Sequence, residues 1–311
     1  MKSTLRFVVC ALGALVSCAM QARAEPVPQV FAPGVVSGPS NDADAAFLPD
    51  DKTVLFARDG AILESTKLGG DWSAPHVASF SGEWMDAQPT MAPDGSFLVF
   101  VSNRPINPGD AKRPGGNLWR VDRHGADWGE PVHLPASVNR GPSIWGPSIA
   151  GDGSLYFMDR AVADGPFKLW RAQARGGDDL AAVPVSFGDA TTQDVDPAVA
   201  PDESFIVFSS KHPADAHERL FIALRDGAGW GRPVDLGDAV NGANDNDSNE
   251  SRLAPDGRTL YFTSDRQSRI AWPRTRAQAE ADLARIAAWD NGNQNIWSVS
   301  LAPWIAAAKK G

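Results

Sequence analysis

The apolar residues of this chain occur in short runs that flank a tight turn, and this arrangement is repeated five times. In the second copy, Met91 and Ala92 precede Pro93-Asp94-Gly95, and residues 98–100 (Leu-Val-Phe) follow it. Runs of β-forming residues on both sides of such a turn predict two antiparallel strands. The aspartate of the turn recurs at positions 50, 94, 152, 202 and 256, so neighbouring copies are 44, 58, 50 and 54 residues apart. This period predicts blades of a β-propeller.

Each copy continues with the patterns of two further strands, and we label the four strands of a repeat a to d from the axis outwards. Residues 117–120 are typical of a strand c, and the Trp-x-x-Pro segment at 128–131 predicts the start of a strand d. The fifth copy lacks a strand d, whereas residues 30–36 have its pattern. We therefore predict an all-β, five-bladed propeller in a single domain, residues 25–311, whose N-terminal strand closes the last blade. Six blades are the alternative.

The Pro-Asp-Gly, Leu-Tyr-Phe and Ser-x-Arg elements of the repeats resemble the WD40-like repeats of the periplasmic TolB-like propeller family. The resemblance covers nearly all of the chain after the first 24 residues. Members of that family usually have six blades, whereas five copies are counted here. The resemblance implies a binding platform or a protein-interaction module and, less often, an enzyme.

The first 24 residues have the features of a secretory signal peptide. Lys2 and Arg6 precede an apolar run at 7–16, and Ala22-Arg23-Ala24 offers small residues for cleavage after Ala24. In the alternative, the segment ending at Cys18 resembles a lipobox, and Cys18 carries a lipid anchor. We therefore expect a periplasmic or secreted protein, or else an outer-membrane lipoprotein. No later stretch is long enough to span a bilayer.

Both cysteines, Cys10 and Cys18, lie in that leader, so residues 25–311 offer no thiol nucleophile, disulfide or thiolate metal ligand. Without the leader, 26 basic residues face 38 acidic ones, a formal charge of −12. This excess argues against nucleic acid or an anionic membrane as the main partner. A protein, a peptide or a glycan remains as the expected partner.

The longest insertion, residues 267–293, lies between strands b and c of the last blade. Thr275 and Gln278 form a capping-box pattern. Four apolar residues share one helical face, namely Ala279, Leu283, Ile286 and Ala287. We predict a helix over about 276–289. We expect its apolar face either to pack on the rim of the propeller or to cover a ligand pocket.

The alternation of strands places the connections of a propeller on two faces. The short, repetitive a–b turns lie on one face, here called the a–b face, and the variable b–c and d–a connections lie on the other, here called the b–c/d–a face. Loops of unequal length at one rim are where repeat proteins usually bind. Trp84 and Trp145 lie in connections of that face, where indoles suit stacking on a sugar or a peptide. The alternative is that these tryptophans cap the core under the loops.

Six residues before each turn aspartate, the five repeats carry Asp44, Gln88, Gly146, Asp196 and Glu250. We expect these residues to ring the mouth of the central channel. The simplest interpretation is a wet channel with polar walls. The alternatives are that Asp44, Asp196 and Glu250 bind a Ca²⁺ ion in the channel or act as catalytic acids and bases. Apart from this calcium ion, no cofactor is expected.

A basic residue ends strand b in every repeat, and this set comprises Arg58, Arg104, Arg160, Lys211 and Arg266. Ion pairs and carbonyl contacts are the simpler interpretation of these residues. In the alternative, Arg104, Arg160 and Arg266 bind a ligand together with Gln88, Trp84 and Trp145. We expect an exported binding module rather than an enzyme, with a carbohydrate-active hydrolase or lyase as the alternative.

Overall fold

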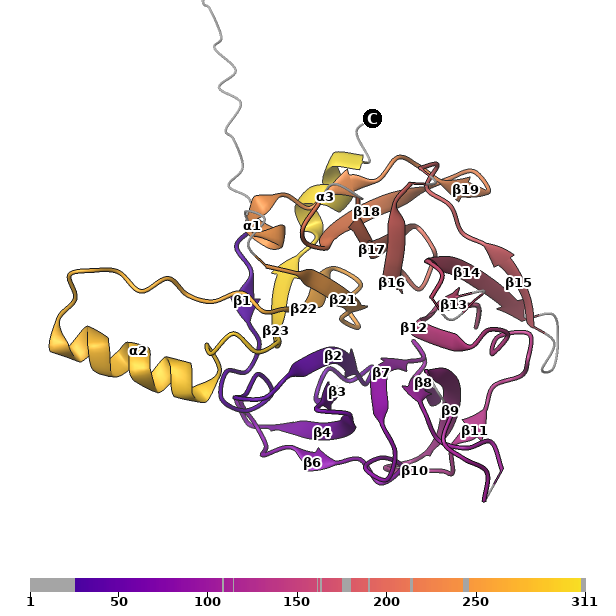
Figure 1. The fold of residues 1–311 in the computed structure, drawn as a ribbon, viewed down its shortest axis with the longest axis horizontal. Coiled ribbons are helices and arrows are strands. Elements are labelled where there is room, and N and C mark those ends of the chain that lie inside the picture. Colours follow the sequence, from indigo (N-terminus) through magenta and orange to yellow (C-terminus); the bar gives the residue numbers. More distant parts are fainter. Residues whose placement is uncertain are drawn as a thin grey trace, which may run out of the picture.

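Five antiparallel sheets surround a central axis (Figure 1). The computed structural model describes residues 26–107, 109–113, 115–160, 162, 164–174, 180–189, 191–212, 215–242 and 246–308. The predicted five-bladed propeller is confirmed, and the six-bladed alternative is wrong. The predicted signal peptide and Cys18 lie outside the described residues. Within the described residues, no helix is long and apolar enough to cross a membrane.

Every blade is a sheet whose first strand in the repeat lies next to the axis. Blade one contains β2 (Asp42–Phe47), β3 (Thr53–Arg58), β4 (Ala61–Leu68), β5 (Asp71–Trp72) and β6 (His76–Val77). Blade two contains β7 (Asp86–Met91), β8 (Phe97–Ser102), β9 (Asn117–His124), β10 (Asp127–Trp128) and β11 (Val132–His133). Blade three contains β12 (Ser143–Ile149), β13 (Leu155–Arg160), β14 (Phe167–Ala174) and β15 (Leu180–Pro184). Blade four contains β16 (Gln193–Val199), β17 (Phe205–Lys211), β18 (Arg219–Asp226), β19 (Gly229–Trp230) and β20 (Val234–Asp235). Blade five contains β21 (Ser248–Leu253), β22 (Thr259–Ser264), β23 (Asn295–Ser300) and β1 (Gln29–Val30).

The outer strand of blades one, two and four is divided into two short pieces. A proline lies between the pieces in each case, at Pro75, Pro131 and Pro233. Proline has no N–H group to donate to a neighbouring strand and is therefore tolerated at a sheet edge rather than in its middle. The Trp-x-x-Pro pattern thus marks an interrupted edge strand.

The N-terminal strand β1 joins the blade formed by the C-terminal part of the chain. Gln29 pairs with Ser298, and Val30 pairs with Trp297. Just beyond the strand, the Ser37 hydroxyl donates to the carbonyl of Ile296, 3.1 Å away. The ring is therefore closed by segments from opposite ends of the chain.

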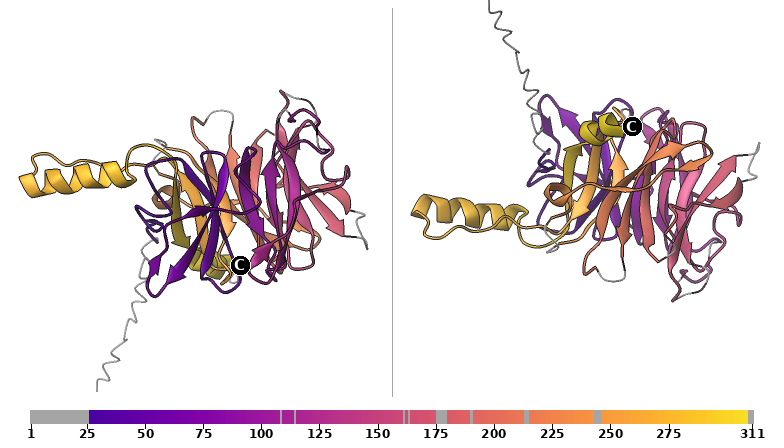
Figure 2. Two further views of the ribbon diagram at one scale, coloured as in Figure 1. Left: turned by 90° about the horizontal axis from the view of Figure 1, so that it is seen from below. Right: turned by 90° about the horizontal axis from the view of Figure 1, so that it is seen from above.

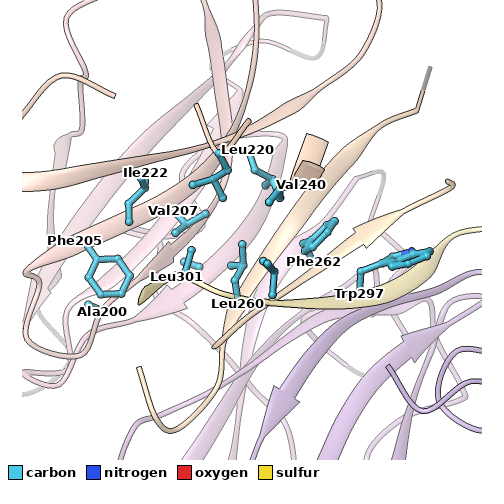
Figure 3. Packing of buried hydrophobic residues seen from close by; sticks show 13 residues of the cluster. Ala200, Phe205, Val207, Leu220, Ile222, Val240, Leu260, Phe262, Trp297 and Leu301 are labelled. Atoms are coloured by element: carbon cyan, nitrogen blue, oxygen red, sulfur yellow. The ribbon is translucent and has the colours of Figure 1, made fainter. Parts of the chain in front are cut away.

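The core lies between adjacent blades. Between blades four and five, Phe205 and Val207 of β17 pack in one cluster with Leu260 and Phe262 of β22 (Figure 3). Short helix α3 (Ala302–Ala308) follows β23, and its residue Trp304 packs against this cluster. Helix α3 and the four-residue helix α1 (Asp238–Asn241) were not predicted from the sequence.

Helix α2 (Arg276–Ala288) forms within the predicted insertion and begins with the predicted capping box at Thr275 and Gln278. However, the helix extends sideways from the rim of the propeller (Figure 2), and none of its residues is buried. Leu283 is 62% exposed. Instead of covering the propeller, α2 is tied to its own preceding segment by an ion pair between Arg274 and Asp282, 2.7 Å apart. The expectation that its apolar face packs on the rim or covers a pocket is therefore wrong.

Candidate functional site

All five innermost strands have a β-bulge at the same place. In β2, for example, the register with β3 shifts between Ala43 and Ala46. The residue at the bulge has a positive φ in every blade, and the values are 61° for Asp44, 50° for Gln88, 60° for Gly146, 49° for Asp196 and 50° for Glu250. A left-handed backbone costs free energy for residues other than glycine. Four of these five residues are not glycine, so the surrounding structure must hold them there.

The bulges bring these five residues together inside the channel, in a level that we call the polar layer. The strands that carry them, β2, β7, β12, β16 and β21, surround the centre of Figure 1. Asp44, Gln88 and Asp196 are buried, and Glu250 is partly exposed. The expectation that these residues form a wet mouth is corrected on this point, because they lie within the strands rather than at their entry.

Gln88 connects the polar layer across the axis. Its side-chain N–H donates to Asp196 Oδ1 at 3.2 Å, and its Oε1 accepts from the Gly146 N–H at 2.7 Å. The backbone N–H of Gln88 also donates to the carboxylate of Asp44. One side chain and its backbone thus join the polar residues of blades one to four.

Arg252 was not predicted as a site residue, and its side chain enters the channel from β21. Arg252 as a whole is 3% exposed, and its Nη2 lies 2.8 Å from Asp44 Oδ1 in blade one. Its Nε donates to the carbonyl of Pro89 in blade two, at 3.0 Å. A signal was present in the repeats. The positions equivalent to Arg252 carry only small side chains, namely Ala46, Thr90, Ser148 and Ala198.

Burial raises the pKa of all three carboxyl groups in the polar layer. Desolvation raises the pKa of Asp44 to about 7, although the nearby Arg252 lowers it. Desolvation and the negative charge of Glu250 raise the pKa of Asp196 to about 8. Desolvation and the charge of Asp44 raise the pKa of Glu250 to about 8. The polar layer contains three carboxyl groups, and Arg252 is the cation beside it. One guanidinium can neutralise only one of three ionised carboxylates.

Further acidic and polar groups continue from the polar layer towards the b–c/d–a face. Glu218, in the b–c connection of blade four, also raises the pKa of Asp196 and is therefore close to it. The side-chain N–H of Asn249 donates to Glu218 Oε2 at 3.0 Å. Glu218, Asn249 and Glu250 are all partly exposed. Together, these three residues form what we call the acidic mouth.

In the described ranges, no group of three or more His, Cys, Asp or Glu side chains is placed to hold a metal ion. The positive charge beside Asp44 comes from Arg252. Calcium binding by Asp44, Asp196 and Glu250 therefore stays a prediction, and the described geometry does not favour it.

The basic residues at the ends of the b strands make contacts within the propeller. Arg58 pairs with Asp42 at 2.6 Å, and Arg104 pairs with Asp86 at 2.9 Å. Arg104 is also buried, and Arg266 donates to the carbonyl of Val240. Arg160 lies over the ring of Phe167, 4.0 Å from its centroid. These contacts agree with the simpler structural interpretation, and ligand binding by Arg104, Arg160 and Arg266 stays a prediction.

Trp84 lies in the d–a connection before β7, and Trp145 lies near the start of β12. Both side chains are partly exposed. Trp145 packs against two clusters of buried residues, and its Nε1–H donates to Ser143 Oγ at 2.7 Å. Its indole is therefore anchored on one side. Stacking of a ligand on these two tryptophans stays a prediction.

A cavity of about 330 Å³ is lined by the ends of the innermost strands and by Pro49, Pro93, Pro201 and Pro255 of the a–b turns. The cavity therefore lies at the a–b face, which the sequence analysis treated as purely structural. We call it the a–b cavity.

These features define a five-bladed β-propeller with acidic and polar side chains joined across its channel. The fold is similar to that of a protein assigned as TolB from Agrobacterium tumefaciens, with 17% identity, a TM-score of 0.50, and coverage of 73% of this chain and 70% of that one. TolB from Acinetobacter baumannii shares 11% identity at a TM-score of 0.49, and the match covers 84% of this chain and 54% of that one. The chain thus has a TolB-like propeller fold, as the repeats predicted.

An oligogalacturonate lyase in complex with manganese is similar at a TM-score of 0.42 and 14% identity, over 84% of this chain and 77% of that one. No protein-family model and no curated protein sequence matches the chain. The likeness to solved structures therefore describes the fold, and the function has to be argued from the channel.

Proposed function

We propose that this chain is an exported propeller that binds a cationic segment of a peptide or protein at the acidic mouth. The lysine or arginine side chain of the partner would enter from the b–c/d–a face towards Glu250 and Asp196. The leader-like sequence of residues 1–24 supports export to the periplasm or the cell exterior.

The observation that carries this proposal is the excess of buried acid over buried base. Arg252 lies beside Asp44, whereas Asp196 is held by the neutral amide of Gln88. The pKa of Glu250 is raised even though Arg252 and hydrogen bonds to Thr263 and Gln88 lower it. Carboxylates in this setting are costly to ionise alone, and a ligand cation that pairs with them offsets that cost. Glu218, at the acidic mouth, adds a further negative charge close to Asp196.

The test measures the binding of labelled heptapeptides of glycine and serine that differ only in their central residue, which is lysine, arginine, norleucine or glutamate. The lysine and arginine peptides should bind at least about tenfold more tightly than the norleucine peptide, a difference of about 1.4 kcal/mol. Glu250→Gln and Glu218→Gln should each remove most of this preference. Glu83→Gln is the matched control, because Glu83 is an exposed carboxylate in a d–a connection of the same face.

Affinity for the lysine peptide should also rise between pH 6 and pH 9. Asp196 and Glu250 become ionised in this range, because their pKa values are raised to about 8. Equal binding of the lysine and norleucine peptides by the wild-type protein would refute the proposal.

The second candidate is a carbohydrate-active hydrolase or lyase that uses Asp44, Asp196 or Glu250. The raised pKa values favour it, because a carboxyl group with a pKa near 8 is protonated at neutral pH and can act as a general acid. It ranks second because the side chains of Gln88 and Arg252 reach between blades at this level and are held there by hydrogen bonds within the protein. Wild-type turnover of a polysaccharide that Glu250→Gln abolishes would reverse this ranking.

A further inference from the structure

The a–b cavity has apolar walls and one charged group at its base. Apolar side chains such as Met91, Ile149, Val199 and Leu253 line it, together with the prolines of four a–b turns. Among the described residues that line it, Arg252 is the charged one. Ligand pockets typically have volumes from about 300 to 1,000 Å³, mostly apolar walls and a few fixed polar groups. The cavity, at about 330 Å³, has these properties and is large enough for a small molecule or a peptide end.

One position of the innermost strands shapes the base of the cavity. At the level directly below the polar layer, four innermost strands carry small side chains, namely Ala46, Thr90, Ser148 and Ala198. The fifth carries Arg252, whose guanidinium reaches Pro89 and Asp44 on other blades. It therefore lies across the axis and closes the base of the cavity.

The guanidinium of Arg252 retains hydrogen-bonding capacity. Nε and Nη1 donate to the carbonyls of Pro89 and Ser251. Nη2 lies 2.8 Å from Asp44 Oδ1, yet both of these buried atoms lack a partner with hydrogen-bond geometry. A guanidinium is charged at all physiological pH values and binds carboxylates through paired N–H groups. Arg252 thus places a buried cation, which already lies beside Asp44, at the end of the cavity.

The rim of the cavity disfavours a ligand with several negative charges. Each a–b turn carries an exposed aspartate directly after the residue that lines or borders the cavity, and these are Asp50, Asp94, Asp202 and Asp256 after prolines and Asp152 after Gly151. Arg171 pairs with Asp152, and Arg258 lies near Asp256. The remaining acidic charge of the rim favours a ligand with a single negative charge over a polyanion.

We propose that the a–b cavity is a second binding site, which takes a single carboxylate carried at the end of an apolar chain. The carboxylate binds Arg252, and the chain lies against Met91, Ile149 and Leu253. A peptide C-terminus with an apolar last residue and a small aliphatic carboxylic acid share this chemistry. The site lies on the face opposite the acidic mouth and does not depend on the proposal for that mouth.

Titration calorimetry with two matched probe pairs tests the site. The first pair is octanoate and octanol, and the second is N-acetyl-Leu-Leu with a free carboxylate and the same peptide with a C-terminal amide. Each carboxylate that fits should bind at least tenfold more tightly than its neutral analogue. Binding of the peptide alone identifies a peptide end as the ligand, and binding of octanoate alone identifies a small acid. If no carboxylate binds at millimolar concentration, or each binds no better than its neutral analogue, the proposal is wrong.

Two variants test whether the carboxylate binds at Arg252. Arg252→Gln should weaken carboxylate binding at least tenfold, whereas Arg258→Gln should change it less than twofold, because Arg258 is an exposed arginine beside the a–b turn of the same blade. If Arg252→Gln does not fold, Thr90→Leu tests the site instead. This variant adds bulk to the cavity wall, leaves Arg252 in place, and should weaken carboxylate binding. Undiminished carboxylate binding by a folded Arg252→Gln or Thr90→Leu variant would overturn the proposal. Binding of the lysine heptapeptide to Thr90→Leu should stay unchanged, so the two proposals fail separately.

Discussion

Gln88 shows how one uncharged side chain organises a channel lined by acids. Its amide donates to Asp196 and accepts from Gly146, so both ends of the amide are used. An amide makes these bonds at any pH, whereas a carboxylate at the same place would add a fourth buried negative charge. The polar layer therefore has one neutral connector and three groups that titrate.

The titration of this layer predicts that stability falls as the pH rises. The pKa values of Asp196 and Glu250 are raised to about 8 in the folded protein, from 3.8 and 4.5. Between these values the folded state binds more protons than the unfolded chain, so the free energy of unfolding decreases towards pH 8. We expect denaturant unfolding to show a less stable wild-type protein at pH 9 than at pH 6.

Asp196→Asn and Glu250→Gln should change this dependence, because an amide cannot ionise. At pH 9 each variant should be more stable than the wild type by at least about 1.4 kcal/mol, the equivalent of one pKa unit. At pH 6 the difference should be smaller. Glu83→Gln serves as an exposed control. A variant that shifts stability equally at both pH values would show that the carboxyl groups are not responsible.

The residues of the polar layer were predictable from the sequence, and their neighbours were not. The repeats give equivalent positions, so Asp44, Asp196 and Glu250 were expected to lie together, and the structure brings them together. The bulge that turns them inward and buries them leaves no clear pattern in the sequence. Arg252 is an exception within the repeats, and a comparison of the five copies at every position would have singled it out.

Among the elements, α2 is stabilised mainly by local interactions. The Thr275 hydroxyl accepts from the Gln278 N–H at 3.2 Å, and Gln278 Oε1 accepts from the Thr275 N–H at 2.8 Å. Asp282 pairs with both Arg274 and Arg285. An isolated helix of this length is marginal in water, so these local bonds decide whether α2 forms.

Thr275→Ala should therefore loosen α2 and leave the propeller unchanged. Loss of an N-cap costs about 1 kcal/mol, which corresponds to roughly fivefold faster amide exchange in the helix. Hydrogen exchange followed by mass spectrometry should show this change in α2, and the melting temperature should stay the same. Glu280→Gln, which breaks an exposed pair with Arg276, should have a smaller effect. A lower melting temperature for Thr275→Ala would mean that α2 supports the ring.

The position of α2 shows the limit of sequence periodicity. The spacing of apolar residues and the capping box predicted the helix correctly, with its first residue in place. Three of the four residues on its apolar side are Ala279, Ile286 and Ala287, and the fourth, Leu283, is exposed. Such a face buries too little area to require a partner in the propeller. Ion pairs of Asp282 with Arg274 and of Arg285 with Asp290 hold α2 instead.

At the scale of the whole molecule, ring closure depends on the segment that includes β1. Phe31, the residue after β1, contacts the rings of Phe47 and Trp72 in blade one and of Tyr261 in blade five, with centroids 5.0 to 5.6 Å apart. Its backbone N–H donates to the carbonyl of Ile296. This residue therefore joins the first and last blades.

Phe31→Ala should destabilise the whole propeller by about 2–3 kcal/mol, somewhat less than a fully buried phenylalanine would. Denaturant unfolding measures the change. Val27→Ala is the control from the same segment, because Val27 is largely exposed, and it should have almost no effect. A loss below about 1 kcal/mol for Phe31→Ala would show that the ring does not depend on this junction.

The single arginine among five equivalent positions also gives the channel a direction. At the level of Arg252 the other four blades carry only small side chains, namely Ala46, Thr90, Ser148 and Ala198. The guanidinium of Arg252 enters from blade five and points towards blades one and two, so a ligand meets a different surface in each orientation around the axis. A structure built by repetition thereby acquires a fixed rotational orientation for whatever occupies its centre.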